Sequence, residues 1–357
     1  MRKLASIQQI RDIQPIPNAD AIEVVIINGW QVVAKKGEFK IGELCVYFEI
    51  DSFLPIKPEF EFLRKSCYKK MADGSKGFRL KTIKLRGQIS QGLALPFDLF
   101  INTKAAFVEI GQDVTELLQV KKYEMPIPPA LQGFAKGNFP SFIRKTDQER
   151  VQNIWYKLKE KYNHINFEVT LKLDGTSATY YYRDGEIGVC SRNLNLKIES
   201  EEDLVDSGIT SSRSKNTYIS CGVRAGIFEG LKKLGRNLAI QGEIIGEGIQ
   251  GNPEKLIGQH FYIFDIWDID KSRYLTHKER LDILQNFHPT RPNLVQILDF
   301  RSLESFSEIE HILQYAEGRS MNAEIREGVV FKSTELIDNE IISFKVISNQ
   351  FLLNAAD

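Results

Sequence analysis

The sequence has few residues of the kinds that bind transition metals or form disulfides. Its 357 residues include 4 cysteines and 5 histidines. The cysteines are far apart and form no C-x-x-C pair, which argues against a zinc site. Cys45 and Cys190 lie inside apolar runs, so we expect buried thiols in a reducing compartment. The histidines show no metal-binding spacing and give no catalytic signal. The cysteines are Cys45, Cys67, Cys190 and Cys221.

Long hydrophobic runs are also absent from the sequence. No apolar run reaches the roughly 18 residues that a transmembrane helix needs, so none is expected. The N-terminal segment MRKLASIQQIRDIQPIPNAD lacks the apolar core of a signal peptide. We therefore expect an intracellular, cytoplasmic protein that is not attached to a membrane, and we expect a monomer.

The chain has no excess of charge of either sign, since 47 Lys and Arg residues balance 47 Asp and Glu residues. This balance excludes a uniformly basic coat for nucleic acid but allows a local patch. The segment from Arg64 to Arg86 is such a patch, with nine Lys or Arg, one acid, Asp73, and interleaved Tyr68 and Phe78. It is either a solvated loop or a surface for nucleic acid.

The pattern of strands and turns indicates two domains. Residues 1–118 contain short apolar strands separated by glycine turns, which is typical of a small barrel or sandwich. Residues 121–142 hold four prolines and two glycines without periodicity, and we interpret them as a linker or an irregular crossing segment. A helix is predicted after Asp147, which we take as its cap. Further strands and two helical segments predict a second, mixed, mostly antiparallel α+β domain.

The segment FEVTLKLDG alternates apolar and polar residues, which predicts a strand followed by a turn at Gly175. Phe167 and Leu173 belong to the apolar face, so Lys172 and Asp174 lie on the other one. Taken alone, this segment gives weak evidence for catalysis, because a solvated lysine next to an Asp-Gly turn is the simpler interpretation.

Two other glycine-containing segments have a structural interpretation. GEGIQG, from Gly246 to Gly251, matches a dinucleotide-binding pattern, but Asn252-Pro253 follows where a helix would have to continue. We therefore interpret it as a glycine-rich turn. Asp184-Gly185 is interpreted as a hairpin turn.

Four further charged residues occur on separate strands or turns: Asp174, Glu243, Glu327 and Lys345. Each of them alone is an ordinary exposed residue. Together with Lys172 they would supply one pocket with an amine nucleophile, oxygen ligands for a hard cation, and a cation for phosphate.

The order of these segments resembles the covalent nucleotidyltransferases, which include ATP-dependent RNA and DNA ligases and mRNA capping enzymes. KLDG resembles motif I, SRN motif Ia, GEIIG motif III, FYIFDIW motif IIIa, EGVVFK motif IV and SFKVIS motif V. The motifs follow the family order at family-like intervals. The finer resemblance is to RNA ligases with an OB-fold domain in front of the transferase domain, to which GEIIGEGIQGNPEKL and FPSFIRKTDQERVQN are similar.

The resemblance covers nearly the whole chain and implies an α+β multidomain fold. It implies an N-terminal OB-fold β-barrel for nucleic acid at residues 1–120 and a linker at 121–140. Residues 141–357 would form an adenylyltransferase domain, an ATP-grasp-like ligase domain of antiparallel sheets with flanking helices. DNA ligases and capping enzymes place the OB domain after the transferase, so the order found here favours an RNA ligase.

The implied activity is ATP-dependent joining of RNA 3′-OH and 5′-phosphate ends with Mg²⁺ or Mn²⁺. A lysyl-AMP intermediate forms first, AMP then moves to the RNA 5′-phosphate, and the 3′-OH displaces it. The nucleophile must be neutral, so we expect burial and nearby cations to lower the pKa of Lys172. Gly175 would let the backbone approach the ligand.

The resemblance also implies roles for individual residues. Lys172 is the nucleophile, Phe264 stacks on adenine, and Arg192 contacts the ribose or the incoming 5′-phosphate. Arg150 and Lys345 clamp phosphates. Asp174, Glu243 and Glu327 would hold the metal through water, and the nucleotide would also contact Thr170, Leu171, Glu243, Glu327 and Lys332. The residues expected to bind nucleic acid are Lys69, Lys70, Arg79, Lys81, Lys84 and Arg86.

The chain departs from the family pattern at two places. Leu171 stands where many relatives have a glutamate that recognises adenine. Ser343 stands where motif V often has a first lysine, and we expect Lys332 to supply the second cation.

Two alternatives stay open. One is a nucleotidyltransferase with another acceptor, either a DNA nick ligase or a GTP-dependent capping enzyme. The other is a non-catalytic nucleic-acid-binding protein. The sequence leaves undecided whether the substrate is a nicked duplex, a bridged break or single strands, and whether it is all RNA.

Overall fold

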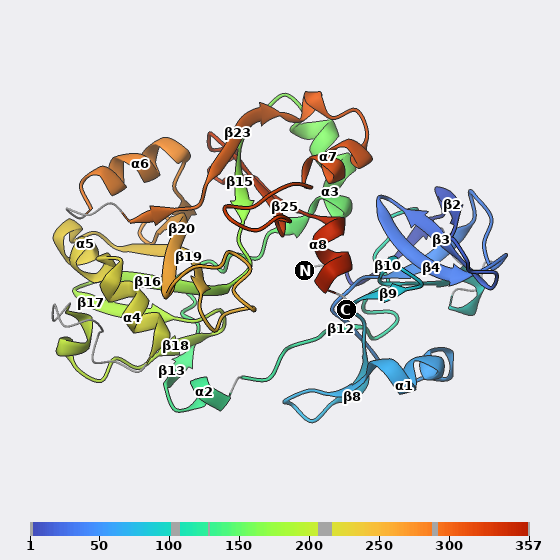
Figure 1. Ribbon diagram of the computed structural model, residues 1–357, viewed down its shortest axis with the longest axis horizontal. Helices are drawn as coiled ribbons and strands as arrows, with labels where there is room; N and C mark the ends of the chain where they lie inside the picture. The colour runs from blue at the N-terminus through green and yellow to red at the C-terminus, as the bar shows by residue number, and fades with distance from the viewer. Residues whose placement is uncertain (1–2, 101–107, 128, 206–215, 288–291, 356–357) are drawn as a thin grey trace. The chain divides into compact units, whose positions relative to one another are not determined.

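A computed structural model describes residues 3–100, 108–127, 129–205, 216–287 and 292–355 (Figure 1). The chain forms two compact units. The first comprises the residues up to Ile127, residues 308–313 and the C-terminal helix α8 (Asn349–Ala355). The second comprises Pro128–Ser307 and Gln314–Ser348. In the described ranges, no helix is long and apolar enough to cross a membrane.

The first unit consists of short antiparallel strands. One sheet has the strand order β1 (Ala5–Gln9), β5 (Leu44–Phe48) and β11 (Leu93–Pro96), and a second has the order β2 (Asp12–Pro15), β3 (Ile22–Ile27) and β4 (Trp30–Lys35). A third sheet has the order β12 (Lys121–Lys122), β6 (Ser52–Leu54), β8 (Lys76–Arg79) and β7 (Tyr68–Lys70). Strands β9 (Thr82–Leu85) and β10 (Gln88–Gln91) form a hairpin. The short helix α1 (Arg64–Cys67) precedes β7. The linker predicted from residue 121 thus begins with a strand of this unit.

Strand β5 separates the two hydrophobic cores of the first unit. Val46 and Phe48 belong to one core, whereas Cys45 and Tyr47 belong to the other, as the two-residue period of a strand requires. Cys45 is therefore buried, as predicted, and burial, followed by the nearby Glu43, raises the pKa of its thiol to about 12. Helix α8 returns to this unit, where Gln91 Nε2 donates to Asn349 Oδ1 at 3.1 Å.

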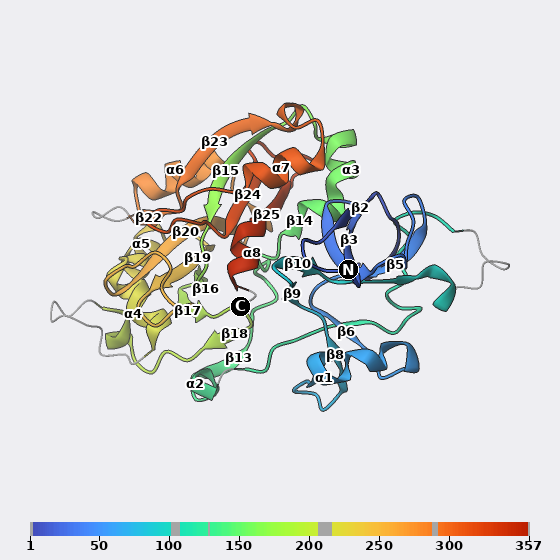
Figure 2. The ribbon, with the colours of Figure 1, turned by 45° about the vertical axis from the view of Figure 1, so that its right-hand side comes forward.

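The second unit contains a five-stranded and an eight-stranded sheet, and both are mainly antiparallel. Only β14 with β25 and β20 with β22 pair in parallel among the described strands. The five-stranded order is β14 (Glu149–Arg150), β25 (Ser343–Ile347), β24 (Gly328–Ser333), β15 (Asn166–Lys172) and β23 (Ile297–Ser302), which Figure 2 shows side by side. The other sheet comprises β13 (Ala135–Asn138), β18 (Leu194–Leu196), β17 (Glu186–Cys190), β16 (Thr176–Arg183), β19 (Leu238–Gly246), β20 (Gln259–Asp268), β21 (Arg273–Tyr274) and β22 (Asn293–Leu294).

Helices cover the eight-stranded sheet. Ile219 of α4, Phe228 of α5 and Ile283 of α6 share a core with Ile240 and Phe261 of the sheet. Thr276 begins α6 with a capping box, as its sequence predicts. The helices on this sheet are α4 (Thr217–Arg224), α5 (Ile227–Leu234) and α6 (His277–Gln285). The second unit also contains α2 (Pro129–Gln132) and α3 (Val151–Lys161), whereas most of α7 (Ile309–Tyr315) belongs to the first unit.

One cap was predicted wrongly, and the two turns were predicted correctly. Helix α3 begins after Arg150, and Asp147 lies in the preceding loop, because Glu149 and Arg150 extend to pair with β25. Asp184 and Gly185 form the hairpin between β16 and β17 with positive φ angles of 52° and 91°. Strand β19 ends at Gly246, and turns follow it where a dinucleotide-binding helix would begin.

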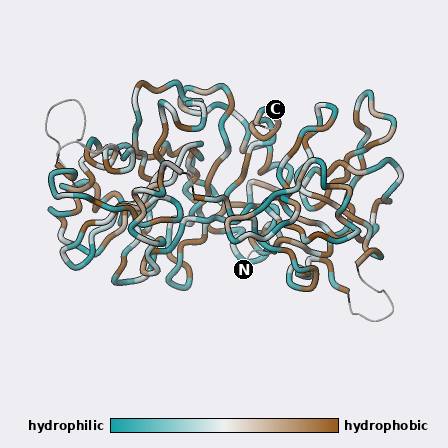
Figure 3. Tube along the Cα trace, turned by 90° about the horizontal axis from the view of Figure 1, so that it is seen from below, coloured by the Kyte–Doolittle hydropathy of each residue, from teal (hydrophilic) through white to brown (hydrophobic). Residues whose placement is uncertain are grey.

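The strands follow the predicted alternation of hydrophobic and polar residues. In Figure 3, hydrophobic positions recur at short intervals along the trace. On β15, Phe167 is fully buried and makes edge contacts with Phe331 and Phe344 at centroid distances of 6.2 and 5.6 Å. This aromatic cluster fastens β15 to the neighbouring strands β24 and β25.

Phe167→Ala is expected to destabilise the second unit by about 3–5 kcal/mol, because it leaves a cavity among aromatic side chains. Differential scanning calorimetry should show the fall as a lower midpoint for this unit. Tyr156→Ala, at an exposed position of α3, is the control and should change stability by no more than about 0.5 kcal/mol. Equal effects of the two changes would contradict the assigned core.

Candidate active site

Lys172 is the last residue of β15, and the β15–β24 pairing determines its surroundings. Lys172 is in register with Gly328, so Glu327, the residue just before β24, lies beside Lys172. Lys172 Nζ donates to Glu327 Oε2 at 2.7 Å, and both side chains are largely buried. Two strands separated by 155 residues in the sequence thus bring the two charges together.

The same register assigns side chains to the two faces of the five-stranded sheet. Thr170 lies opposite Val330, which lies opposite Lys345, which lies opposite Arg150. Directly opposed residues share a face, so Lys172, Lys345 and Arg150 project from the same face. Leu171 projects from the other one, where it packs with Leu173 and Ile245.

The two faces of the sheet give Leu171 and Thr170 different surroundings. The Leu171 side chain is buried in an apolar cluster, and its N–H donates to the carbonyl oxygen of Gln296 at 2.9 Å. The side chain and the N–H of Leu171 thus have partners within the protein, and its expected contact with the nucleotide stays a prediction. Thr170 is buried on the same face as Lys172.

Two glycines are required by the packing of strands around Lys172. A Cβ on Gly175 would lie 2.3 Å from the carbonyl oxygen of Ile244 in β19. A Cβ on Gly328, whose φ is 151°, would lie 2.1 Å from the carbonyl oxygen of Val346. We expected Gly175 to allow approach of a ligand, but the close neighbour is another strand.

Two further carboxylates interact electrostatically with the Lys172–Glu327 pair. Burial raises the pKa of Glu243 to about 7, and Lys172 partly offsets this effect. Burial, followed by the nearby Glu327, raises the pKa of Asp174 to about 6. Three carboxylates thus face one lysine, which leaves an excess of negative charge. Within the described ranges, no three His, Cys, Asp or Glu side chains are close enough to hold a metal ion directly.

The expected direction of the Lys172 pKa is wrong for the protein without ligand. Burial lowers this pKa, but Glu327, Glu243 and Asp174 outweigh burial and raise it above its ordinary value. The groups facing the amine are carboxylates, whereas we expected cations there. The amine is therefore held in its charged form by its acidic neighbours.

Two of the cations expected to bind phosphate, Arg150 and Lys345, lie further along the sheet face, and the third, Arg192, follows β17 of the other sheet. Asp147 lies between two of them: its Oδ1 is 3.5 Å from Arg192 Nη2 and 3.9 Å from Lys345 Nζ. Arg150 is in register with Lys345 on the neighbouring strand. The structure thus brings Arg150, Arg192 and Lys345 to one region of the second unit.

Phe264 occupies an irregular position on β20. Asp265 pairs with Gln241 and Ile263 pairs with Gly242, so Phe264 is the extra residue of a β-bulge. Bulges redirect a side chain next to functional sites. The Phe264 ring is partly exposed, and Lys332 Nζ lies 5.4 Å from its centre.

Lys332 contacts other groups than the cations expected to bind phosphate. Its side chain is 2% exposed, and its Nζ donates to the Phe264 carbonyl oxygen at 2.5 Å and pairs with Asp265 at 3.0 Å. Burial lowers its pKa, although Asp265 opposes the shift. The sequence motif suggested a phosphate ligand, but this lysine supports the backbone that carries Phe264.

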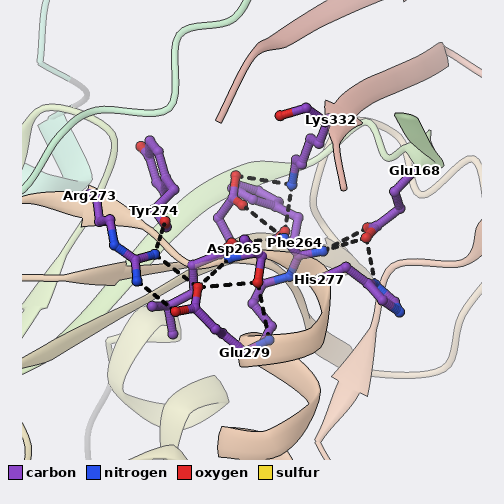
Figure 4. Close-up of polar contacts among 12 residues, drawn as sticks. Glu168, Phe264, Asp265, Arg273, Tyr274, His277, Glu279 and Lys332 are labelled. Carbon is purple, nitrogen blue, oxygen red and sulfur yellow. Dashed lines mark hydrogen bonds and ion pairs between the residues drawn. The ribbon is translucent and has the colours of Figure 1, made fainter. Parts of the chain in front are cut away.

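Lys332 belongs to a buried ionic network that sequence reasoning missed (Figure 4). Glu168 accepts hydrogen bonds from Arg280 at 2.6 and 2.8 Å and contacts His277 at 2.6 Å. Arg280 also lies 3.8 Å from Asp265. The network connects β15 and β24 with β20 and α6. The only signal in the sequence was Glu168 itself, a charged residue within a strand that is otherwise buried.

The six basic residues expected to bind nucleic acid fall into two groups in the first unit, one on the sheet that contains β7 and β8 and one at the β9–β10 hairpin. Lys69, Lys70 and Arg79 belong to β7 and β8. Arg79 also packs on Tyr123, with its guanidinium 4.3 Å from the ring centre. Lys84 lies on β9, Arg86 lies in the following turn with a φ of 52°, and Lys81 precedes β9.

Glu243→Gln is expected to change how stability depends on pH. Between pH 4.5 and about 7 the folded protein keeps a proton on Glu243 that the unfolded chain has released. Stability therefore falls as pH rises through this range. The neutral variant avoids this loss, so it should be the more stable protein near pH 8 and equal to the parent near pH 4. Thermal unfolding at a series of pH values measures this pH dependence of stability, and Glu160→Gln, at an exposed position, is the control. Identical stability profiles for the parent and Glu243→Gln would contradict the prediction.

Comparisons with known proteins identify both units. A family model described as an OB-fold domain matches residues 4–97, and a model described as RNA ligase matches residues 165–347. No curated protein matches the chain significantly.

Solved structures of one RNA ligase are similar over the full length. A variant of the Naegleria gruberi RNA ligase without ligand is 45% identical, with a TM-score of 0.80, covering 99% of this chain and 98% of its own. A variant with ATP and Mn is 44% identical with a TM-score of 0.80, and one with AMP and Mn is 44% identical with a TM-score of 0.81; each alignment covers 99% of both chains.

These matches confirm the predicted family and fold class, including the OB-fold domain that precedes the catalytic domain. With 45% identity over nearly its whole length to a solved RNA ligase, and with a matching family model, the chain belongs to the RNA ligase family.

Proposed function

We propose that this protein is an ATP-dependent RNA ligase that joins a 3′-OH to a 5′-phosphate through a lysyl-AMP intermediate on Lys172. The observation that carries the proposal is the polar face of the five-stranded sheet. It holds a largely buried lysine beside Glu327 and, further along, cations suited to phosphates. The Naegleria gruberi relatives that were solved with ATP or AMP and Mn support the choice of nucleotide and metal.

In the first step, the neutral amine of Lys172 attacks the α-phosphorus of ATP. An N–P bond forms, the bond from the α-phosphorus to the bridging oxygen breaks, and pyrophosphate leaves with the bond's electron pair. The amine must lose its proton first, yet the acidic neighbours raise its pKa. Neutralising those carboxylates would remove the interactions that raise the pKa and leave burial, which lowers it.

The donor set fits a hard divalent cation. Asp174, Glu243 and Glu327 are oxygen ligands. Burial, with a smaller contribution from the nearby Glu327, raises the pKa of the first two to about 6 and about 7, and a cation would stabilise their charged forms. Because no three such side chains in the described residues converge closely, these carboxylates would contact Mg²⁺ or Mn²⁺ through its waters. When bound, the ion would stabilise charge on the α-phosphate.

Residues of both sheets would bind and orient the nucleotide. Phe264, redirected by its bulge, would stack on adenine, with Lys332 and Asp265 fixing its backbone. Arg150, Arg192 and Lys345 would bind phosphates, and Thr170 would line the pocket next to Lys172.

Two more transfers would complete the reaction. AMP would move from Lys172 to the RNA 5′-phosphate, forming a P–O–P bond while the N–P bond breaks. The 3′-OH would then attack the RNA phosphate and release AMP. Two alternatives remain for this site: a DNA nick or a cap as the acceptor, the latter with GTP. Labelling of the protein by ATP indicates ligation, whereas labelling by GTP indicates capping.

Mass spectrometry of the intact protein tests the first step. Incubation with ATP and Mg²⁺ should add about 329 Da, the mass of one AMP attached to the lysine nucleophile. Lys172→Ala should remove the adduct, whereas Lys161→Ala, at the exposed end of α3, should keep it. An adduct formed from GTP alone would favour the capping alternative. A folded parent protein that forms no adduct with either nucleotide would refute catalysis and favour a binding protein.

Changes in the basic residues of the first unit test RNA binding. Replacing Lys69 and Lys70 with alanine should weaken RNA binding and flatten its salt dependence, by about 0.7 in the log–log slope for each lost contact to a single strand. Fluorescence anisotropy over a salt series measures both effects. The exposed pair Lys35 and Lys36 is the matched control. Equal losses in both double variants would indicate non-specific charge effects and contradict the assignment.

A further inference from the structure

The two strands β7 and β8 form an antiparallel ribbon in the first unit, and β7 is the last strand of its sheet. The pairs in register are Tyr68–Phe78, Lys69–Gly77 and Lys70–Lys76. Directly opposed residues share a face and successive residues alternate between faces, so the first and third pairs lie on one face and the second pair lies on the other. We call the face with the first and third pairs the Tyr68 face.

Two lysines oppose each other on the Tyr68 face. Lys70 and Lys76 are both exposed, and among the residues that the structure describes neither forms an ion pair. The acid in the turn between them, Asp73, instead accepts hydrogen bonds from the backbone N–H and the hydroxyl of Ser75 at 2.9 and 2.6 Å. Like charges that are directly opposed destabilise a ribbon, so an anion bound between the two lysines would stabilise it.

The Tyr68 ring lies beside these lysines and is held in place by its neighbours. It contacts the edge of Phe78 at a centroid distance of 6.4 Å, and the Arg64 guanidinium lies 5.4 Å from its centre. Arg64 begins α1, which lies beside β8 (Figure 1), and it donates two hydrogen bonds to Glu61 at 2.6 and 2.7 Å. Phe78 is fully buried, but Tyr68 is 37% exposed. A ring that is both held and exposed can stack on a base with little loss of conformational freedom.

The ring and the lysine pair are spaced to contact neighbouring parts of one nucleic-acid strand. Tyr68 and Lys70 are two residues apart on β7, so they lie about 7 Å apart along the strand. A ring next to cations is the combination that binds single strands, because the ring stacks on a base while the cations contact the backbone. In a duplex the faces of the bases are covered by their neighbours, so only an unpaired base can reach the ring.

We propose that the Tyr68 face binds an unpaired nucleotide of the RNA substrate. Its base stacks on Tyr68, and a phosphate of the same strand lies between Lys70 and Lys76. The inference rests on the proposed function for the choice of RNA as the ligand. It deepens that function because it specifies the form of the RNA: part of the substrate is single-stranded, as in an overhang, a gap or a free end.

Replacement of the ring tests the stacking contact. Tyr68→Ala should weaken binding of a single-stranded RNA by about 5- to 100-fold, the loss expected for one base stacked on an aromatic ring. Binding of a blunt duplex of the same sequence should stay at the parental level. Tyr68→Phe keeps the ring and should bind like the parent. Fluorescence anisotropy without ATP measures all four, and Tyr156→Ala, which removes an exposed tyrosine of α3, is the matched control.

Reversal of one charge separates RNA binding from a structural role. Lys76→Glu places opposite charges across the ribbon from each other, so the thermal unfolding midpoint should stay the same or rise. The same change should weaken binding of the single strand and lower the log–log salt slope by about 0.7 or more. Lys36→Glu, at an exposed position outside the ribbon, is the matched control. A lower midpoint together with weaker binding would indicate a structural role and overturn the proposal.

A tryptophan in place of the tyrosine reports the stack directly. Fluorescence of Tyr68→Trp should be quenched by the single-stranded RNA, beyond any change in the parent's own tryptophans, and should not be quenched by the blunt duplex. No additional quenching would overturn the proposal, as would equal losses of single-strand and duplex binding in Tyr68→Ala. Because these assays contain no ATP, they stand apart from the proposed function, which a parent that forms no AMP adduct would refute.

Discussion

The ion pair between Lys172 and Glu327 is the interaction on which the rest of the site depends. Its geometry comes from the β15–β24 ladder, in which Lys172 opposes Gly328. A shift of one residue in that ladder would move every side chain of β15 to the other face, placing Lys172 among leucines and Leu171 at the site. On the apolar face of the sheet, the aromatic contacts of Phe167 with Phe331 and Phe344 stabilise this register.

The charge distribution around that pair shows which groups influence the protonation of Lys172. Acidic neighbours keep the lysine protonated, and their own pKa values rise because they are buried together. Lys345 lies further along the sheet face, and Asp147 lies between it and Arg192, which follows β17 of the other sheet. A ligand that brings phosphates and a divalent cation would complement both regions at once, as the proposed adenylation of Lys172 requires.

The buried ionic network gives the second unit a different kind of support. Glu168, Arg280, Asp265 and Lys332 connect the five-stranded sheet with β20 and α6 through paired charges. Breaking one member of such a network leaves an uncompensated buried charge, which is costly. The network holds the backbone at Phe264, so the same contacts that join the sheets also position the ring proposed to stack on adenine.

The sequence by itself determined the elements with a clear period. Alternation on β15 placed Lys172 and Leu171 on opposite faces, the Asp184-Gly185 pair formed a hairpin, and the motif order led to the correct family and fold class. These features are local or come from resemblance, so they needed no knowledge of long-range contacts.

Only the tertiary structure decided which charged residues meet. Lys332 and Lys345 both lie on strands and carry the same charge, yet one is buried against Asp265 and the other lies close to Asp147. Asp147 looked like a helix cap until pairing of Arg150 with β25 moved the start of the helix. The physical reason is that a charge's partner, and hence its pKa and its role, depends on the register between strands far apart in the sequence, which no local pattern specifies.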